Sequence, residues 1–290
     1  MLIYYFKKSI YKFLSAISKE MFLKFQFQRL VGYRLNLKSP KTYNEKLQWL
    51  KLYYRDEKMS QCADKVEVRK YIKDKGLGDF LNEVYGVWGD VDDIDFDRLP
   101  KQFVMKSTHA SGQTIICRDK STLNIEAAKK KMKKWLKTNL YYFGLEWVYK
   151  DLQPRIICEA LISSKDTYPP KDYKFYCFNG QPKFILVASE RNGHNAKMDY
   201  FDLNWEPIDM RQGGDRSGIG ILKPSNLEKM IDIAKVLSQD FPHVRVDFYN
   251  EDGKILIGEL TFFDSSGFAK FEPKEYDRVI GDFLLLPKKV

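Results

Sequence analysis

Two apolar runs near the C-terminus restrict the fold more than any other feature of the sequence. Residues 243–250 (HVRVDFYN) and 254–263 (KILIGELTFF) are rich in β-branched and aromatic residues, and turn-forming residues from Asn250 to Gly253 separate them. This pattern predicts a β-hairpin. Each predicted strand carries one acid among apolar neighbours, Asp247 in the first and Glu259 in the second. An acid inside an apolar strand costs free energy unless it is paired or bound to a metal. The two acids therefore indicate a functional site on this hairpin.

We expect the two acids to face each other across the hairpin, an arrangement that suits a magnesium ion. Carboxylate oxygens are the hard ligands that Mg²⁺ prefers, and Mg²⁺ usually shares them with nucleotide phosphates. Arg245 lies two residues before Asp247 and therefore on the same face of its strand. The alternative is a purely structural ion pair between Arg245 and one of the carboxylates, and the sequence leaves both interpretations open.

A second candidate site lies at residues 103–117 (FVMKSTHASGQTIIC). Two β-rich runs flank a loop from Ser107 to Gln113, and Lys106 ends the first run. Small residues such as Ser111 and Gly112 allow backbone N–H groups to approach phosphate oxygens, and a lysine adds a compact positive charge. The loop is not a P-loop, because GxxxxGK[ST] is absent. An ordinary polar hairpin with an exposed lysine is the alternative.

A third, weaker cluster follows in the next two β-rich runs. Within RIICEALI (155–162), Glu159 ends an apolar strand, where it is suited to contact the edge of a nucleotide. Asp172 and Lys174 lie in DYKFYCF (172–178).

The rest of the chain predicts an α+β fold. Its 290 residues correspond to about two domain-sized units, and 44% apolar residues supply a large core. Helical patterns precede residue 100, and strand pairs rather than a regular βαβ series follow it. A further helix is expected to begin at Ser225, because Ser225 and Glu228 form a capping-box pattern. We therefore divide the chain into a basic arm (1–39), a helical N-terminal region (40–100) and an α+β domain (101–290).

Positive charge is concentrated in the first 40 residues. Eight lysines and arginines stand there against Glu20 alone, which accounts for seven of the ten net positive charges. Apolar residues recur at three- and four-residue steps from Leu2 to Ile17, so we expect an amphipathic helix. It suits either an anionic membrane surface or packing on the domain with a solvated basic face. Nucleic acid is not an expected partner, since no recognisable binding module accompanies the arm.

The cysteines and the apolar runs indicate the cellular compartment in which the protein is expected to act. Cys62, Cys117, Cys158 and Cys177 are far apart and form no CxxC pair, so neither disulfides nor a zinc site is expected. No apolar run approaches the roughly 20 residues that span a bilayer. Residues 1–25 lack the apolar core of a secretory signal. These features favour the reducing cytoplasm.

The order of these clusters resembles the ATP-grasp superfamily. It comprises a lysine on a strand, a small-residue loop, a strand ending in Glu, and RxD and ExT on a terminal hairpin. More closely, the chain resembles the TupA-like ATP-grasp proteins, which are found among genes for bacterial cell-surface polysaccharides. The resemblance runs from about Tyr43 to Pro287. Its most specific stretches are DYKFYCFNG (172–180), RVDFYN (245–250) and GELTFFDSSGF (258–268).

The resemblance implies a fold, two cofactors and a set of site residues. The implied fold is the ATP-grasp fold, in which two α+β subdomains clasp ATP, here with the basic amphipathic arm before it and the ATP-grasp domain at residues 101–290. The implied cofactors are ATP and Mg²⁺. The implied roles are Lys106 and Lys65 for the phosphates, Ser107, Ser111 and Gly112 for the covering loop, Glu159 and Leu161 for adenine, Asp172 and Lys174 for the ribose side, Asp247, Glu259 and Thr261 for the metal, and Arg245 and Lys106 for catalysis.

One position departs from the superfamily pattern. Superfamily members usually carry Asn two residues after the second metal acid, and here the residue is Thr261. A hydroxyl can still bind a metal or a metal-bound water, so activity is expected, while the number of metal ions stays open. Ser265, Ser266 and Gly267 follow where relatives position the acceptor substrate.

The implied chemistry is ATP-dependent carboxylate activation. ATP phosphorylates a carboxylate to an acylphosphate, and an amine then displaces phosphate to form an amide. For this branch the implied substrates are a uronic acid of a capsule, O-antigen or teichuronic-type glycan and an amino acid or amine. A lipid-linked glycan would bring residues 1–38 to the inner face of the plasma membrane.

Two other functions remain open at this stage. A glycosyltransferase is one, because Asp93, Asp95 and Asp97 provide two short DxD patterns that resemble the metal motif of nucleotide-sugar enzymes. A non-catalytic, membrane-attached ATP-binding protein is the other, and Thr261 motivates it.

Overall fold

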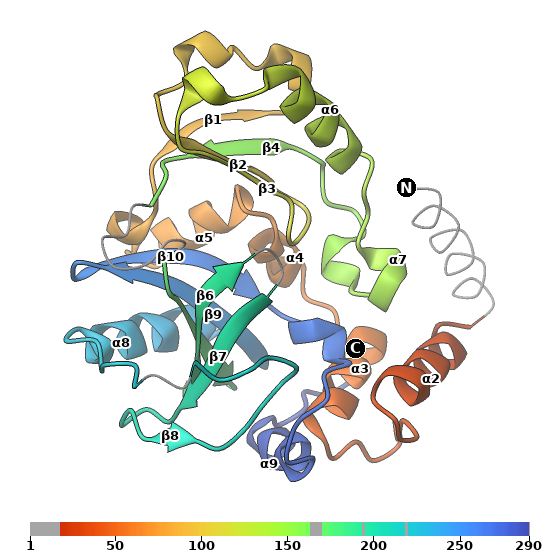
Figure 1. Cartoon of the computed structure of the whole chain (residues 1–290). Helices are drawn as coiled ribbons and strands as arrows, with labels where there is room; N and C mark the ends of the chain where they lie inside the picture. The colour runs from red at the N-terminus through yellow and green to blue at the C-terminus, as the bar shows by residue number, and fades with distance from the viewer. Residues whose placement is uncertain (1–17, 163–169, 193–194, 218–219, 290) are drawn as a thin grey trace.

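Two antiparallel β-sheets form the body of the chain. The computed structural model describes residues 18–162, 170–192, 195–217 and 220–289 (Figure 1). The small sheet has the order β1 (Val84–Trp88), β4 (Ile156–Glu159), β2 (Phe103–Ser107), β3 (Thr114–Cys117). The large sheet has the order β10 (Lys254–Thr261), β9 (His243–Glu251), β5 (Asp172–Phe178), β6 (Gln181–Asn192), β7 (Asn195–Phe201), β8 (Pro207–Ile208).

Helices pack around and between the two sheets. The α-helices are α2 (Lys19–Leu30), α3 (Tyr43–Tyr53), α4 (Glu57–Ala63), α5 (Glu67–Asp74), α6 (Ile125–Trp135), α7 (Tyr141–Gly144), α8 (Leu227–Ser238) and α9 (Glu275–Phe283). Short 3-10 helices are η1 (Gly78–Phe80), η2 (Val91–Asp93), η3 (Phe96–Arg98), η4 (Lys120–Thr122), η5 (Trp147–Tyr149) and η6 (Asp264–Gly267). Figure 1 shows α6 above the small sheet and α8 beside the large one, with α4 and α5 between the sheets. The predicted α+β architecture is confirmed.

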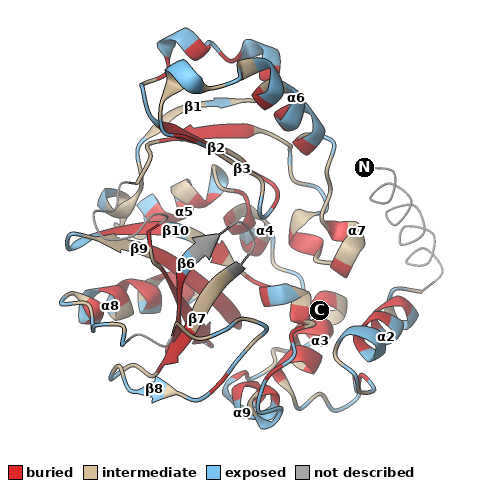
Figure 2. Cartoon of the chain, in the orientation of Figure 1, coloured by how far each residue is buried: buried red, intermediate tan, exposed pale blue. Residues whose placement is uncertain are grey.

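Each sheet has its own apolar core. Phe103, Met105 and Ile156 of the small sheet pack with Met132 and Trp135 of α6. The larger core joins the six-stranded sheet to α8 and to the N-terminal helices (Figure 2). The small sheet takes β1 from the region before residue 101, which pairs with β4. Two separate cores produce two lobes, and the space between them is available for a ligand.

The strand faces explain where polar side chains collect. Alternate residues of a strand point to opposite faces. On β5 and β9, one set of alternate residues, including Cys177, Val244 and Phe248, belongs to the larger core, and α8 contacts both strands. The other set contains Lys174, Arg245 and Asp247, so the charges of these strands share the face opposite α8.

The expected hairpin is confirmed, whereas the expected helix start at Ser225 is wrong. β9 and β10 pair around a turn at Asp252 and Gly253. The helix α8 begins at Leu227 and has no side-chain cap. Asn226 instead donates its amide to Asn250 Oδ1 at 3.1 Å and to the Gly253 carbonyl at 3.0 Å. Tertiary contacts with the hairpin turn therefore replace the predicted local cap.

The described part of the basic arm packs on the body. Residues 1–17, and with them the whole predicted amphipathic stripe, lie outside the described residues. In α2, Phe22, Leu23 and Phe27 are buried, while Met21 and Phe25 are 68% and 62% exposed. None of the described helices is long and apolar enough to cross a membrane.

Candidate active site

Charged residues of three neighbouring strands meet on one face of the large sheet. Glu259 of β10 lies opposite Asp247 of β9, and Thr261 lies opposite Arg245. On the other side of β9, Lys174 of β5 lies opposite Asp247. The prediction that Asp247 and Glu259 face each other across the hairpin is confirmed.

A β-bulge at Gly258 creates this pairing. The register shifts between Ile257, which pairs with Phe248, and Glu259, which pairs with Asp247. In an unbroken ladder Gly258 would lie opposite Asp247, so the extra residue is what brings the second acid into position. A Cβ atom at Gly258 would lie 3.2 Å from the Asp247 carbonyl oxygen, which favours glycine here.

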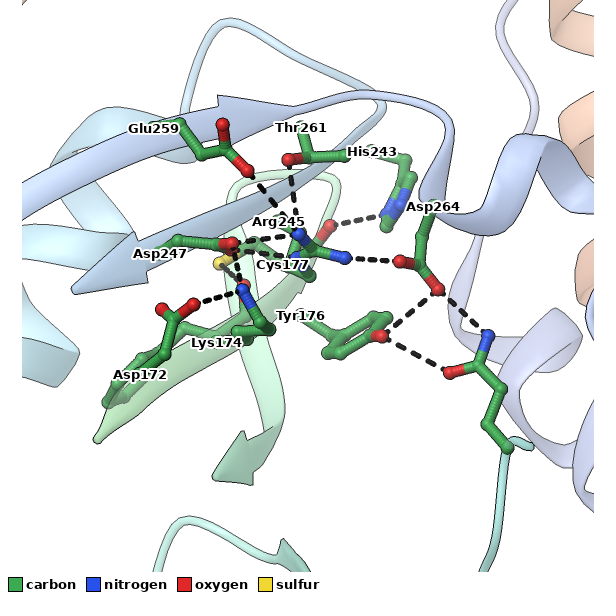
Figure 3. Close-up of polar contacts among 12 residues, drawn as sticks. Asp172, Lys174, Tyr176, Cys177, His243, Arg245, Asp247, Glu259, Thr261 and Asp264 are labelled. Carbon is green, nitrogen blue, oxygen red and sulfur yellow. Dashed lines mark hydrogen bonds and ion pairs between the residues drawn. The ribbon is translucent and has the colours of Figure 1, made fainter. Parts of the chain in front are cut away.

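Asp247 is held between two cations (Figure 3). Arg245 Nε and Nη2 lie 2.7 Å from its two carboxylate oxygens, and Lys174 Nζ lies 2.5 Å from Oδ2. Lys174 also binds Asp172 at 2.7 Å. Burial raises the pKa of Asp247, but attraction to Arg245 and Lys174 outweighs this effect and holds the pKa below its ordinary value. Asp247 is therefore an ionised carboxylate in a buried network.

Asp264 completes the network, and our sequence analysis did not identify it. Its carboxylate accepts hydrogen bonds from Arg245 Nη1, from the Tyr176 hydroxyl at 3.1 Å and from Gln212 Nε2 at 2.8 Å (Figure 3). Asp264 directly follows the apolar run of β10, so an acid at the end of a core strand was the available signal. With Asp247 on one side and Asp264 on the other, the Arg245 guanidinium has a defined orientation.

Glu259 is the more accessible acid of the hairpin pair. Its side chain is 37% exposed, and Oε1 lies 3.8 Å from Arg245 Nη2. Thr261 Oγ1 accepts a weak hydrogen bond from the same nitrogen at 3.3 Å. Within the described residues no three His, Cys, Asp or Glu side chains form a metal cluster. Asp247 and Glu259 fit Mg²⁺, which commonly takes one or two carboxylates and completes its shell with water and phosphate oxygens.

The small sheet contributes a lysine and a loop opposite these acids. Lys106, on β2, lies 2.8 Å from Glu159 at the end of β4, and Arg69 lies 3.6 Å from the same carboxylate. Lys65 donates from its backbone to the Thr108 carbonyl at 3.1 Å and from Nζ to the Ala110 carbonyl at 2.7 Å. Lys65 thus links the loop between β2 and β3 to the helical region.

Two adjoining cavities open at this junction. The loop cavity, of about 290 Å³, lies between the two lobes. The turn cavity, of about 260 Å³, extends toward η6. The loop cavity is lined by Lys65, Lys106, Ala110–Thr114, Asp172, Lys174, Arg245, Asp247, Tyr249, Gly258 and Glu259. The two cavities share Lys65, Ala110, Ser111, Arg245 and Glu259.

The structure brings most of the expected site residues to these cavities, but not all. Ser107, Glu159 and Leu161 are not among the residues that line either one. The Ser107 hydroxyl is buried without a hydrogen-bond partner, and Glu159 approaches the loop cavity only through its ion pair with Lys106. Thr261 lines the turn cavity, as do Ser265 and Ser266.

In the acidic segment that contains the DxD patterns, Asp95 and the neighbouring Asp90 have a local structural role. Asp90 Oδ1 accepts the Asp92 N–H and caps η2, and Asp95 Oδ1 accepts the Asp97 N–H and caps η3. Asp92 also pairs with Lys133 of α6 at 2.6 Å. These acids lie beside the small-sheet core and line neither the loop cavity nor the turn cavity.

Two lobes, a lysine and loop on one, and paired acids on the other define a protein of the ATP-grasp fold. The family model described as TupA-like ATPgrasp matches residues 45–285, and the chain belongs to this family. The expected family and fold are confirmed.

Three of the solved structures that match the chain are ligases or synthetases. They are D-alanine–D-alanine ligase from Bacillus anthracis (18% identity, 77% of this chain and 59% of that chain, TM-score 0.40), L-amino acid ligase from Bacillus licheniformis (13%, 71% and 42%, 0.42), and N5-carboxyaminoimidazole ribonucleotide synthetase (14%, 84% and 59%, 0.46). The chain thus spans less than two thirds of each of these proteins. No curated protein matches the chain.

Proposed function

We propose that this protein is an ATP-dependent, ADP-forming carboxylate–amine ligase. The observation that carries this proposal is the facing pair Asp247–Glu259, with Arg245 beside it, at the boundary between the loop cavity and the turn cavity. A nucleotide in the loop cavity would place its terminal phosphate at that boundary. Substrates in the turn cavity would then meet the phosphate without crossing bulk water.

The acidic residues of the site would bind the metal, and the basic residues would bind the negative charge of the phosphates and of the reacting carboxylate. Asp247 and Glu259 would hold Mg²⁺, which neutralises phosphate charge when bound. Lys106 and Lys65 would bind phosphate oxygens, and Arg245, held by Asp264, would stabilise the oxyanion that develops during acyl transfer. Ser111 and Gly112 would cover the phosphates from the loop. The Thr261 hydroxyl would bind the metal or a metal-bound water.

The adenosine end of the nucleotide would lie toward β4 and β5. Glu159, the last residue of β4, and Leu161, two residues later, would approach the adenine. Asp172 and Lys174 of β5 would approach the ribose. Since Glu159 is paired with Lys106, we propose that nucleotide binding redistributes this ion pair.

Our proposal for the substrates rests on the resemblance to this family. We propose a uronic acid of a cell-surface glycan and an amino acid or amine, joined as an amide in the cytoplasm, where ATP is available. All four cysteines are free and buried, which agrees with a reducing compartment. The exposed Met21 and Phe25 of α2, together with the basic residues before them, would allow the arm to approach an anionic membrane that carries a lipid-linked glycan.

A panel of acids and amines tests the proposal. ADP release with Mg²⁺ is measured over uronic acids and amino acids, and mass spectrometry detects the condensed product. Hydroxylamine, which converts acylphosphates to hydroxamates, reports activation when no amine substrate is present. We expect Lys106→Ala and Glu259→Ala to remove product formation.

Matched surface variants provide the control. Lys101 is 75% exposed at its side chain before β2, and Glu126 is exposed in the first turn of α6. Lys101→Ala and Glu126→Ala should retain wild-type turnover. Full turnover in both Lys106→Ala and Glu259→Ala would contradict the assignment. Loss of activity in Asp93→Ala instead would favour a glycosyltransferase, and ATP–Mg²⁺ binding without ADP release by the wild-type protein would favour a non-catalytic role.

A further inference from the structure

Both cations and acids line the turn cavity. Where it meets the loop cavity, Lys65, Arg245 and Glu259 line it, and Asp264, which pairs with Arg245, lines it as well. Glu146, which lies between α7 and η5, lines it together with Ser265 and Ser266 of η6. Apolar side chains line much of the remainder, among them Leu140, Val68, Leu260 and Phe263. A volume of about 260 Å³ suits a molecule of amino-acid size.

The Glu146 carboxylate lines the cavity beside Ser266. Its carboxylate accepts a hydrogen bond from Ser266, and burial raises its pKa while Lys51 opposes that effect. Within the described part of the chain, Glu146 forms no ion pair with a lysine or an arginine. A half-buried carboxylate in this position is costly unless a cation or a donor joins it.

Lys51, the lysine that acts on Glu146, donates hydrogen bonds to backbone groups of the cavity wall. Lys51 is 1% exposed, and its Nζ donates to the Gly144 carbonyl at 2.6 Å, the Ser266 carbonyl at 2.7 Å and Ser266 Oγ at 2.9 Å. Burial lowers its pKa to about 7, and attraction to Glu146 acts in the other direction. Lys51 therefore joins the α7 segment to η6 behind the cavity and does not neutralise Glu146 directly.

The turn that carries Ser266 is strained and held in place. Ser265 and Ser266 have φ values of 47° and 53°, in the left-handed region that non-glycine residues rarely adopt. Gln48 donates to the Ser266 and Gly267 carbonyls at 3.0 Å and 2.7 Å, beside the Lys51 contacts. These buried contacts fix the position of Ser266. Because Ser266 donates a hydrogen bond to Glu146, they also restrict the orientation of the carboxylate that lines the cavity.

We propose that Glu146 binds the protonated amino group of the amine substrate and thereby selects cationic amines. The Glu146 carboxylate also accepts the proton that this group loses before the free amine attacks the acylphosphate carbon and phosphate leaves. The inference rests on the ligase function proposed above and goes beyond it by naming the amine site. Lys65 and Arg245 would receive the phosphorylated carboxylate, while Glu146 and the Ser266 hydroxyl receive the ammonium group. These two sets of contacts would orient the two substrates toward each other.

Two nucleophiles separate this role from a structural one. An amino acid presents an ammonium group, whereas hydroxylamine is largely uncharged at neutral pH. In Glu146→Gln, we expect KM for the amine to rise about 10- to 100-fold, as for loss of a charged hydrogen bond. Hydroxamate formation should stay within about twofold of wild type. Glu146→Asp, which keeps the charge, should show a smaller rise in KM, and the surface variant Glu126→Gln should show none.

The ratio of amide to hydroxamate is measured within one preparation, so the fraction of folded enzyme cancels. An unchanged ratio in Glu146→Gln, whether both rates stay or both fall, overturns the inference and leaves the ligase function intact. An absence of both hydroxamate and ADP from the wild-type enzyme over the whole acid panel overturns the ligase function itself, and the inference with it. A selective fall in the ratio supports Glu146 as the amine site.

Discussion

Arg245 and Asp247, two positions apart on β9, form a two-point ion pair in which both nitrogen–oxygen distances are 2.7 Å. Lys174, on the neighbouring strand β5, donates a hydrogen bond to the same carboxylate. A metal can therefore share Asp247 only in competition with protein cations, whereas Glu259 faces the cavity with a more exposed side chain. This difference predicts separate consequences for changes at the two acids and at their partners.

Asp247→Asn should remove Mg²⁺-dependent turnover and also weaken the fold. The change leaves Arg245 and Lys174 buried with less counter-charge, which costs about 3 kcal/mol of unfolding free energy. ADP release should fall at least about 100-fold. Urea unfolding and ADP release at increasing Mg²⁺ measure the two effects. Asp232→Asn, at an exposed position of α8, is the control and should change neither the stability nor the turnover. If turnover in Asp247→Asn still rises with Mg²⁺ to the wild-type level, Asp247 is not a metal ligand.

Asp264→Asn should lower kcat more than it lowers ATP affinity, because Arg245 loses the carboxylate that orients its Nη1 group. We expect a decrease in kcat of about 10- to 100-fold. Tyr176→Phe is the matched variant, since it removes one hydrogen bond to the same carboxylate and leaves the ion pair. It should cost about 1 kcal/mol of stability with little change in kcat. Equal effects of the two variants on kcat would contradict a positioning role for Asp264.

His243 should make the protein less stable in mild acid. Its Nδ1 donates to the Cys177 carbonyl at 3.0 Å, so Nε2 accepts from the Tyr43 hydroxyl at 2.9 Å. Burial lowers the pKa of His243 from 6.5 to about 4. Between these values the unfolded chain binds a proton that the folded chain does not, so stability falls as the pH falls from 6.5 to 4, by up to about 3 kcal/mol.

Urea unfolding of wild type and His243→Gln at several pH values measures this contribution. The variant should be less stable at pH 7 because it loses a buried hydrogen bond. Its stability should nevertheless change less than that of wild type across the acid window. Parallel curves for the two proteins would show that His243 does not titrate in this range.

Gly281→Ala should destabilise the contact between α9 and α3. A Cβ atom at Gly281 would lie 2.3 Å from the Lys41 carbonyl oxygen and 2.7 Å from the Tyr43 backbone nitrogen. Backbone atoms cannot move aside as a flexible side chain can, so the clash should exceed the gain in helix propensity of about 1 kcal/mol. We expect a net loss of about 2 kcal/mol, measured by thermal unfolding. Gly89→Ala, where a Cβ would meet no atom within 4 Å, should be close to neutral.

Local patterns in the sequence were sufficient for the hairpin and its two acids. Strand propensity, the turn at Asn250–Gly253 and the placement of Asp247 and Glu259 are all properties of neighbouring residues, and the pairing of the two acids is confirmed. The family and fold followed from the order of short motifs and are also confirmed. The expected helix cap at Ser225 failed because Asn226 is used by the hairpin turn, a contact between segments about 24 residues apart.

The sequence by itself determined which charged residues lie on the same strand face, because side-chain direction in a strand alternates with a fixed period. Only the tertiary structure decided what each charge meets. Asp264 reaches Arg245 from 19 residues away, and Lys51 reaches Ser266 from 215 residues away. The position of Glu146 beside Ser266 depends on the same long-range contacts. Burial and distance set the energies of these charges, and both arise only when the two lobes and the N-terminal helices pack together.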